Sequence, residues 1–316
     1  MNSQNLPSPK SKGIGFNDSR LFDFRRSTVV TWGTFDGVHL GHRALLKRMR
    51  EIATERGLKS AVLTFTRPPQ NYLGRPKKLI LPMGKKLELL RKEVDEVVAL
   101  EFPDVQMLTP EAFVKSILIE KLGAAVVVVG DGKDFRFGHK RTGDLNTLKK
   151  LAGELRVEVE VIPPFMVDGK PVSSTAIREL IKAGAVEKAT RLLSYSPLLC
   201  GVVILGVGRG RQLGFPTANL KIDAELATPD EGVFAARVSF KNKTKDGVLY
   251  IGRRPTFDGK AKSFEVHILN TSEELYGEYL EVSLLKKLRG DEHFSDSAAL
   301  LQQIKADIKA AEALFK

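Results

Sequence analysis

The stretch TVVTWGTFDGVHLGH, residues 28–42, decides the fold of the first half of the chain. Its first residues, 28–32, are β-branched or apolar and predict a strand. After residue 42, apolar side chains recur at helical spacing as far as residue 56, and Gly57 suits the end of a helix. A strand that passes through a glycine-containing turn into a helix is typical of a parallel α/β sheet.

The same alternation of strand and helix continues to residue 195. Further strands are expected at 60–65, 97–100, 125–129 and 157–162, and helices at 87–93, 109–122, 175–183 and 186–193. The run 125–129 is entirely apolar, as expected for a strand that helices cover on both faces. The pattern predicts a Rossmann-like α/β domain.

From about residue 196 the pattern changes to short strands and Gly/Pro turns. Alternating runs at 233–240, 247–251, 263–269 and 279–285 predict an antiparallel β-barrel or sandwich, and 295–316 returns to helical spacing. A length of 316 residues fits two domains. We therefore expect a mobile tail at 1–20, a first domain at 21–195 and a second at 196–316.

Composition narrows the classes of function. Lys and Arg number 50 against 38 Asp and Glu, a net charge of +12, which favours anionic partners. Because aromatic residues do not alternate with basic ones, small phosphorylated substrates are favoured over nucleic acid, which stays the rival class. The single cysteine, Cys200, excludes an internal disulfide. No apolar run approaches a membrane span and residues 1–20 resemble no secretory signal, so we expect a cytoplasmic protein.

The turn after the first strand carries a candidate phosphate site. Gly33 and Gly37 permit close approach of a ligand, and the start of the following helix offers free N–H groups. His39 and His42 are three residues apart, so both project from one face of the first helical turn. The alternatives are a metal site, with His139 as a third ligand, or a polar surface.

A second element supports the phosphate hypothesis. Ser173, Ser174 and Thr175 begin a predicted helix, and Arg178 follows one turn later, which is an arrangement suited to an anion. Taken alone, these residues are equally an ordinary helix cap with an exposed arginine. The strings Gly33-x-Phe-Asp-Gly-Val-His-x-Gly-His42 and Ser-Ser-Thr-x-x-Arg both resemble those of the bacterial FAD synthetases.

The resemblance implies that FMN is adenylylated by ATP in the first domain. It implies that His39 and His42 stabilise charge on the α-phosphoryl group, and that Phe135 and Phe137 line the flavin pocket. The nucleotide-binding residues that it implies are Gly33, Phe35, Asp36, Gly37, Gly41, Ser173, Ser174, Thr175 and Arg178. The loops 64–69 and 130–138 depart from the family pattern, so the alternative is a kinase with impaired or altered adenylyltransferase activity.

The second domain has its own glycine-rich segment, Gly206 to Asn219. Pro216 excludes a dinucleotide-binding fingerprint, because it interrupts the helix that should follow. Thr217 and Asn219 are two apart in an extended segment, so their oxygens face one side and suit Mg²⁺. Glu265 alternates with apolar neighbours on a predicted strand and is a candidate general base. The alternatives are a barrel turn and a solvent-facing carboxylate.

These segments resemble the riboflavin kinase module, together with Tyr250–Phe257, Tyr276-Gly277 and Leu288-Arg289. The resemblance implies a six-stranded barrel in which Glu265 takes the proton of the ribityl hydroxyl and Thr217 and Asn219 bind Mg-ATP. It implies that Arg289 contacts flavin or phosphate. The implied nucleotide-binding residues here are Gly208, Gly210, Gly214 and Pro216.

The sequence therefore predicts a bifunctional riboflavin kinase and FMN adenylyltransferase that uses Mg²⁺. Its expected partners are riboflavin, FMN and ATP, without nucleic acid or membrane. The oligomeric state does not follow from the residues.

Overall fold

The computed structural model describes residues 26–74, 76–132, 135–206, 210, 214–256, 259–271 and 273–315, with the backbone alone at 254–256 and 259–261. The expected tail at 1–20 lies outside these residues. The chain divides into two compact units. The α/β unit runs to Lys77 and includes Leu81–Ser173, and the barrel unit comprises Lys78–Ile80 and Ser174–Lys316.

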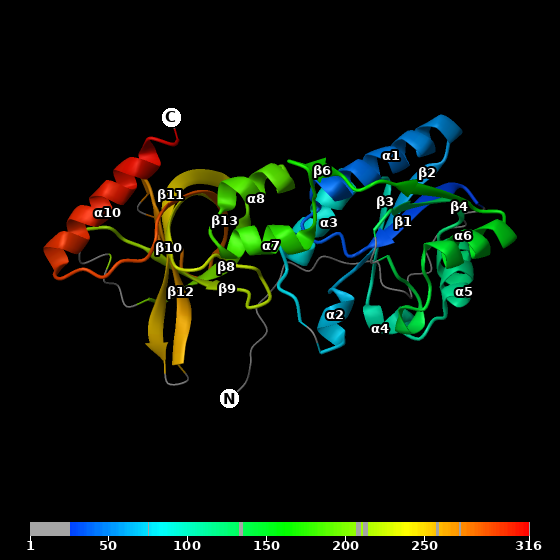
Figure 1. Ribbon diagram of the computed structural model, residues 1–316. Coiled ribbons are helices and arrows are strands. Elements are labelled where there is room, and N and C mark those ends of the chain that lie inside the picture. Colours follow the sequence, from blue (N-terminus) through cyan, green and yellow to red (C-terminus); the bar gives the residue numbers. More distant parts are fainter. Residues whose placement is uncertain are drawn as a thin grey trace. The chain divides into compact units, whose positions relative to one another are not determined.

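A five-stranded parallel sheet forms the centre of the α/β unit (Figure 1). Its strand order is β3-β2-β1-β4-β5. The strands are β1 (Thr28–Gly33), β2 (Lys59–Phe65), β3 (Glu96–Leu100), β4 (Ala124–Gly130) and β5 (Glu158–Ile162). Because β1 lies between β2 and β4, the chain reverses direction across the sheet at β1, and this is where parallel sheets bind ligands. The predicted parallel α/β fold is confirmed.

Helices cover both faces of this sheet. Leu46 and Met49 of α1 (Leu40–Arg56) and Leu87 of α3 (Met83–Arg91) pack on one face. The other face is covered by the π-helix η1 (Phe113–Lys121), which continues α5 (Pro110–Ala112), and by α6 (Leu145–Glu154). Gly57 ends α1 in the left-handed conformation (φ 65°), as its position in the sequence predicts.

Several short elements do not follow from the apolar pattern. They are α2 (Pro69–Tyr72), α4 (Phe102–Val105), the 3-10 turn η2 (His139–Arg141) and the hairpin of β6 (Met166–Val167) and β7 (Lys170–Pro171). Helix α6 was also not expected, although Asp144 caps it by accepting a hydrogen bond from the Thr147 N–H at 2.8 Å. The short elements bury few apolar residues, so their periodicity is weak, whereas α6 buries Leu148, Leu151 and Ala152 at helical spacing.

A closed barrel forms the centre of the barrel unit, with strand order β10-β11-β12-β9-β8-β13. The strands are β8 (Leu198–Ile204), β9 (Ala218–Ile222), β10 (Gly232–Phe240), β11 (Lys243–Thr256), β12 (Gly259–Ile268) and β13 (Tyr279–Arg289). All six neighbouring pairs are antiparallel. The strand pattern alone fitted a barrel or a sandwich, and the six-stranded barrel that the resemblance implied is confirmed. Alternate residues such as Phe234, Leu249 and Val266 fill its interior.

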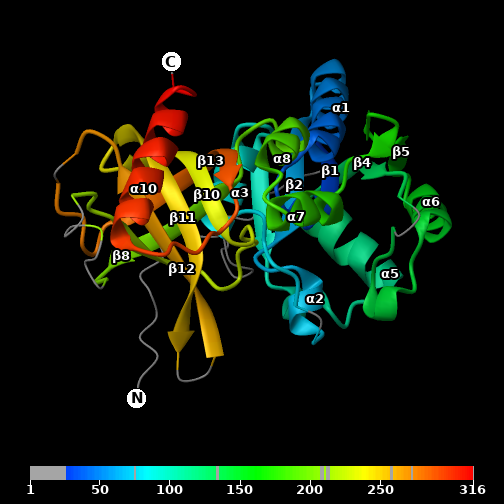
Figure 2. The same ribbon diagram turned by 60° about the vertical axis from the view of Figure 1, so that its left-hand side comes forward.

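Three helices within the described residues accompany the barrel. Helices α7 (Ser174–Lys182) and α8 (Val186–Leu193) precede it, and Val186 packs within the barrel core. The C-terminal helix α10 (Ser297–Glu312) lies along the outer face of the barrel, where Ala311 packs against Val233 and Val248 (Figure 2). The expected C-terminal helix is thus confirmed, whereas the domain boundary at 195/196 stays a prediction. Over the described ranges, no helix combines the length and apolar character that crossing a bilayer requires.

Candidate active sites

The loop that joins β1 to α1 has an unusual backbone. Phe35 (φ 47°), Gly37 (φ 83°) and Val38 (φ 37°) all adopt the left-handed conformation, which costs energy for residues other than glycine. The side chains of Phe35 and Val38 are buried, and so is Asp36. Core packing therefore stabilises a strained loop that leads from the end of β1, at Gly33, to the start of α1.

Two histidines meet at the start of α1. His39 is the N-cap, and its Nδ1 accepts a hydrogen bond from the His42 backbone N–H at 3.3 Å. The two imidazole rings stack with centroids 3.6 Å apart and planes 16° apart. A Cβ atom at Gly41 would lie 3.2 Å from the His39 ring, so a larger residue would crowd the pair. The rings stand beside the free N–H groups of a helix N-terminus, which favour an anion.

The environment of His42 keeps its imidazole neutral. Burial lowers its pKa well below 6.5, and the neighbouring charges of His39 and Lys86 lower it further. Its buried Nδ1 has no hydrogen-bond partner within the described part of the chain. A neutral imidazole carries one N–H, and the unpaired Nδ1 of His42 can donate to an oxyanion in the tautomer that places the hydrogen on it.

The metal alternative gains no support from His139. Its Nδ1 donates a hydrogen bond to the Gln106 carbonyl at 3.0 Å instead. Nor do any three His, Cys, Asp or Glu side chains among the described residues come together as a metal site.

Aromatic rings gather at the end of β1. The indole of Trp32 lies 5.6 Å from the Phe135 ring and 5.7 Å from the Phe137 ring, with Phe113 at 5.5 Å. Phe137 is buried in the core, whereas Phe135 is partly exposed. Of the two residues that the sequence assigns to the flavin, Phe135 is thus the one with a free surface, and Trp32 is a neighbour that the sequence did not single out.

Lys86 is a buried cation that the sequence analysis missed. Its side chain, on α3, is 6% exposed, and its Nζ donates to the Phe65 carbonyl at 2.6 Å and to the Thr34 carbonyl at 3.2 Å. Burial lowers its pKa to about 8, against the opposing effect of Asp36. The available signal was its position: it lies on the apolar face of α3 beside Leu87, where a lysine is unusual.

The Ser-Ser-Thr-x-x-Arg segment spans the division between the two units. Ser173 ends the α/β unit, and Ser174 begins α7 in the barrel unit together with Thr175. The Arg178 Nε donates to the Lys78 carbonyl at 2.6 Å. The anion-binding role of this segment stays a prediction.

In the barrel unit, glycines lie against the two residues expected to bind Mg-ATP. A Cβ atom at Gly206 would overlap the Asn219 amide group, and one at Gly210 would lie 3.1 Å from the Thr217 hydroxyl. Gly214 is left-handed, with φ 83°. The Pro216 carbonyl accepts a hydrogen bond from His267 Nδ1 at 2.8 Å, and Gly208 lies outside the described residues.

One row of cross-strand neighbours connects the candidate kinase residues. The strand registers pair Arg289 with Val233, Val233 with Tyr250, Tyr250 with Glu265, and Glu265 with Asn219. Directly opposed residues share a face of the sheet, so the row lies on the outer face of the barrel. The hydroxyl group of Thr217, which lies just before β9, donates a hydrogen bond to Glu265 Oε2 at 3.3 Å. Three predicted site residues, Thr217, Asn219 and Glu265, are therefore neighbours.

A cavity of about 220 Å³ lies next to this group. It is lined by Val203, Pro216, Thr217, Ala218, Val266, Ile268, Thr271, Glu273, Glu274, Leu275 and Tyr276. Its walls combine apolar side chains with the Thr217 hydroxyl and two carboxylates, which is the mixed lining typical of a small-molecule site.

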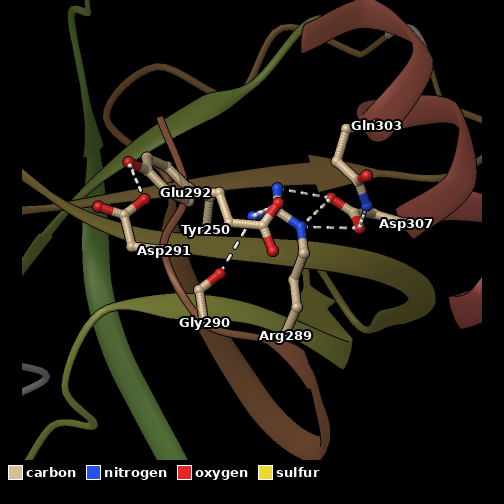
Figure 3. Close-up of polar contacts among 7 residues, drawn as sticks. All are labelled: Tyr250, Arg289, Gly290, Asp291, Glu292, Gln303 and Asp307. Atoms are coloured by element: carbon tan, nitrogen blue, oxygen red, sulfur yellow. Dashed lines mark hydrogen bonds and ion pairs between the residues drawn. The ribbon is translucent and has the colours of Figure 1, made fainter. Parts of the chain in front are cut away.

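The guanidinium group of Arg289 is already engaged within the barrel unit (Figure 3). Its Nε and Nη2 contact both carboxylate oxygens of Asp307 on α10 at 2.9–3.1 Å, and Asp307 also accepts from the Gln303 amide at 2.8 Å. Both charged side chains are largely buried, at 14% and 8% exposure. This pair fastens α10 to β13, and contact of Arg289 with flavin or phosphate stays a prediction.

Tyr250 stands at the centre of the row, between Glu265 and α10. Its hydroxyl donates to Asp291 at 3.1 Å (Figure 3). Burial and the charge of Asp291 raise its pKa to about 12, and Glu265 adds to the shift. The Tyr250 phenol therefore stays protonated at physiological pH and can donate a hydrogen bond.

Comparisons with known proteins agree with this two-part architecture. The FAD synthetase family model matches residues 22–176, and the riboflavin kinase family model matches residues 193–315. Curated relatives named bifunctional riboflavin kinase/FMN adenylyltransferase include those of Haemophilus influenzae, 35% identical, and Listeria monocytogenes, 36% identical. The alignments cover 91% of this chain and 94% and 92% of those proteins, respectively.

A solved structure shares the fold along nearly the whole chain. It is described as a macrolide-efflux protein from Streptococcus pneumoniae, and it matches with a TM-score of 0.81 and 31% identity. The match covers 90% of this chain and 94% of that one. Both family models fall on the units that carry the two candidate sites, and the relatives align over both: the chain belongs to the family of bifunctional riboflavin kinase/FMN adenylyltransferases.

Proposed function

We propose that the chain makes FAD in two steps: the barrel unit phosphorylates riboflavin, and the α/β unit adenylylates the FMN formed. The observation that carries this proposal is the presence of two separate sites of different chemistry. One is a stacked histidine pair at a helix N-terminus, and the other is a carboxylate beside hydroxyl and amide oxygens. Family membership supports both halves.

Adenylyl transfer suits the first site. An oxygen of the FMN phosphate attacks the α-phosphorus of ATP, and the bond from that phosphorus to the bridging oxygen of pyrophosphate breaks. A phosphate monoester has a second pKa of about 6 and is largely dianionic at neutral pH, so no general base is required. Positioning and charge stabilisation remain to be supplied. His39 and His42 supply N–H donors beside the start of α1, and Gly33, Phe35, Asp36, Gly37 and Gly41 shape the loop against the nucleotide.

The flavin ring is assigned to the aromatic group at the end of β1. Phe135 offers a partly exposed face, with Trp32 and the buried Phe137 behind it. Stacking on such rings contributes binding beyond the area buried. Because Trp32 is the only tryptophan in the chain, FMN or FAD bound here would quench its fluorescence.

Phosphoryl transfer to riboflavin has a different requirement. The nucleophile is an alcohol, which must lose a proton as it attacks the γ-phosphorus of ATP. Glu265 accepts that proton, and Thr217 fixes the orientation of the carboxylate. Thr217 and Asn219 offer the hard oxygen ligands that Mg²⁺ prefers, and they would hold Mg²⁺ together with the ATP phosphates. Bound Mg²⁺ would neutralise phosphate charge, and we assign Gly208, Gly210, Gly214 and Pro216 to binding of the nucleotide.

Three further assignments, of location, domain boundary and leaving-group site, complete the proposal. A chain with one buried cysteine suits the reducing cytoplasm. We place the functional boundary at 195/196, which leaves residues 1–20 as a tail. We also assign Ser173, Ser174, Thr175 and Arg178 to the pyrophosphate leaving group, on the resemblance of that segment.

Product analysis tests the proposal. The protein, mixed with riboflavin and Mg-ATP, should yield FMN first and then FAD and pyrophosphate on chromatography. FMN that accumulates without FAD would contradict the first site, and no turnover of riboflavin would contradict the second.

Two variants separate the sites. Glu265→Gln should stop FMN formation but leave FAD formation from supplied FMN intact. His42→Ala should have the reverse effect. Each variant is thereby the other's control for correct folding, and a variant that loses both activities would refute the division of labour.

A further inference from the structure

Lys86 connects two neighbouring strands where both end. Phe65 is the last residue of β2, and Thr34 directly follows β1. One ammonium group donates to both of their carbonyl oxygens, at 2.6 and 3.2 Å. Because β1 and β2 are parallel neighbours, these carbonyls mark the edge of the sheet where the loop to the histidine pair begins.

The loop that follows β1 requires stabilising contacts. Phe35 and Val38 are both strained, and strained backbone persists only where its surroundings over-determine it. Three side chains do so through backbone oxygens: Lys86 and the Thr64 hydroxyl both donate to the Thr34 carbonyl, and Arg43 Nε donates to the Val38 carbonyl at 3.2 Å. Thr64 is itself part of β2, whereas Lys86 reaches the ends of both strands from α3.

Burying a lysine side chain to hold two carbonyl groups costs free energy. A neutral donor could bond two carbonyls, whereas a buried ammonium group must also lose its water. We therefore expect the positive charge to have a function in the site. It lowers the pKa of His42, and it would attract the negative phosphate groups of a bound nucleotide.

We propose that Lys86 is a positioning residue for adenylyl transfer, whose buried ammonium group fixes the loop from Thr34 to Val38 and, through it, the His39–His42 pair. The inference rests on the proposed function of the α/β unit. It adds to that function a residue on α3, outside the sequence motifs, which acts on the reaction through the histidines.

The test compares Lys86→Met with Lys92→Met. Lys92 follows the same helix, is exposed, and pairs with Glu88. In Lys86→Met, kcat for FAD formation from FMN and ATP should fall about 100-fold, the loss that a small misplacement of catalytic groups produces. The KM for FMN should stay close to the wild-type value, because the aromatic group is untouched. Phosphorylation of riboflavin by the same chain should not change, and Lys92→Met should match the wild type throughout.

A second readout separates positioning from packing. In an NMR titration of the histidine side chains, His42 should have a higher pKa in Lys86→Met than in the wild type, since a neighbouring positive charge is gone. A residue that only fills space would leave this value unchanged.

A third variant keeps the inference testable should Lys86→Met unfold the α/β unit. Thr64→Val removes the other donor to the Thr34 carbonyl and conserves volume, and it should lower kcat by a smaller factor, again with unchanged KM. A wild-type kcat in Lys86→Met overturns the inference, as does a wild-type kcat in Thr64→Val when the first variant does not fold. Absence of FAD formation in the wild type would instead overturn the proposed function.

Discussion

The buried charge of Lys86 should make the stability of the α/β unit depend on pH in the alkaline range. Its pKa falls from 10.5 in the unfolded chain to about 8 in the folded protein, so at pH 7 the charged form costs folding about 3 kcal/mol. The sign follows from linkage. Between pH 8 and 10.5 the unfolded chain binds the proton more strongly than the folded one, so stability rises with pH across that window.

From pH 7 to pH 9.5 the free-energy cost of burying the Lys86 charge decreases by about 2 kcal/mol. Lys86→Met lacks the titrating group, so its free energy of unfolding should gain about 2 kcal/mol less than that of the wild type over the same interval. The loss of two hydrogen bonds shifts the variant by a constant that does not depend on pH. The difference between the two slopes therefore isolates the charge.

Urea unfolding followed by tryptophan fluorescence measures this directly. The single tryptophan, Trp32, lies in β1, so its signal reports the α/β unit and not the barrel. Wild type, Lys86→Met and Lys92→Met are unfolded at pH 7 and pH 9.5, and the exposed Lys92 serves as the control for removing any lysine. Parallel slopes in wild type and Lys86→Met would refute a buried, charged Lys86.

Two further outcomes follow from the barrel unit. Asp307→Ala should destabilise the barrel by roughly 3–5 kcal/mol in calorimetry, because it leaves the charge of Arg289 largely buried without its partner; a melting temperature near that of the wild type would contradict a structural ion pair. Gly206→Ala should lower kcat/KM of riboflavin phosphorylation about 10-fold or more by displacing Asn219, whereas Gly290→Ala, whose Cβ would meet nothing within 4 Å, should match the wild type. Equal effects of the two glycine variants would count against the role of Asn219.

The sequence predicted most of the α/β architecture because its signals are local. The strand–turn–helix at residues 28–56 combines β-branched residues, glycines and apolar periodicity within one short segment, and the sheet forms around it. The alternating strand pattern alone fitted a barrel or a sandwich, because closure depends on pairings between distant segments such as β10 with β13; the six-stranded barrel came from the resemblance and is confirmed. Helix α6 was missed although its cap, Asp144, and the helical spacing of Leu148, Leu151 and Ala152 both mark it.

The site was only partly predictable, for a related reason. His39 and His42 are neighbours in sequence, so their stacking follows from helical spacing. Lys86 reaches the same site from another helix, and a lysine in an amphipathic helix ordinarily indicates a solvated surface. The ion pair of Arg289 was missed for the same reason, because its partner, Asp307, lies on a helix whose packing no local pattern specifies. Contact of Arg289 with flavin or phosphate stays a prediction.

The two sites differ in the way that their nucleophiles require. A phosphate monoester already carries the charge with which it attacks, so a base would add little, and the first site instead keeps His42 neutral by burial and by the nearby charge of Lys86. A protonated imidazole there would bind phosphate groups tightly before reaction as well as in the transition state, which does not raise kcat. An alcohol has a proton to lose, and the second site places a carboxylate, Glu265, within reach of the Thr217 hydroxyl and opposite Asn219. The groups that each site presents thus match the reaction assigned to it.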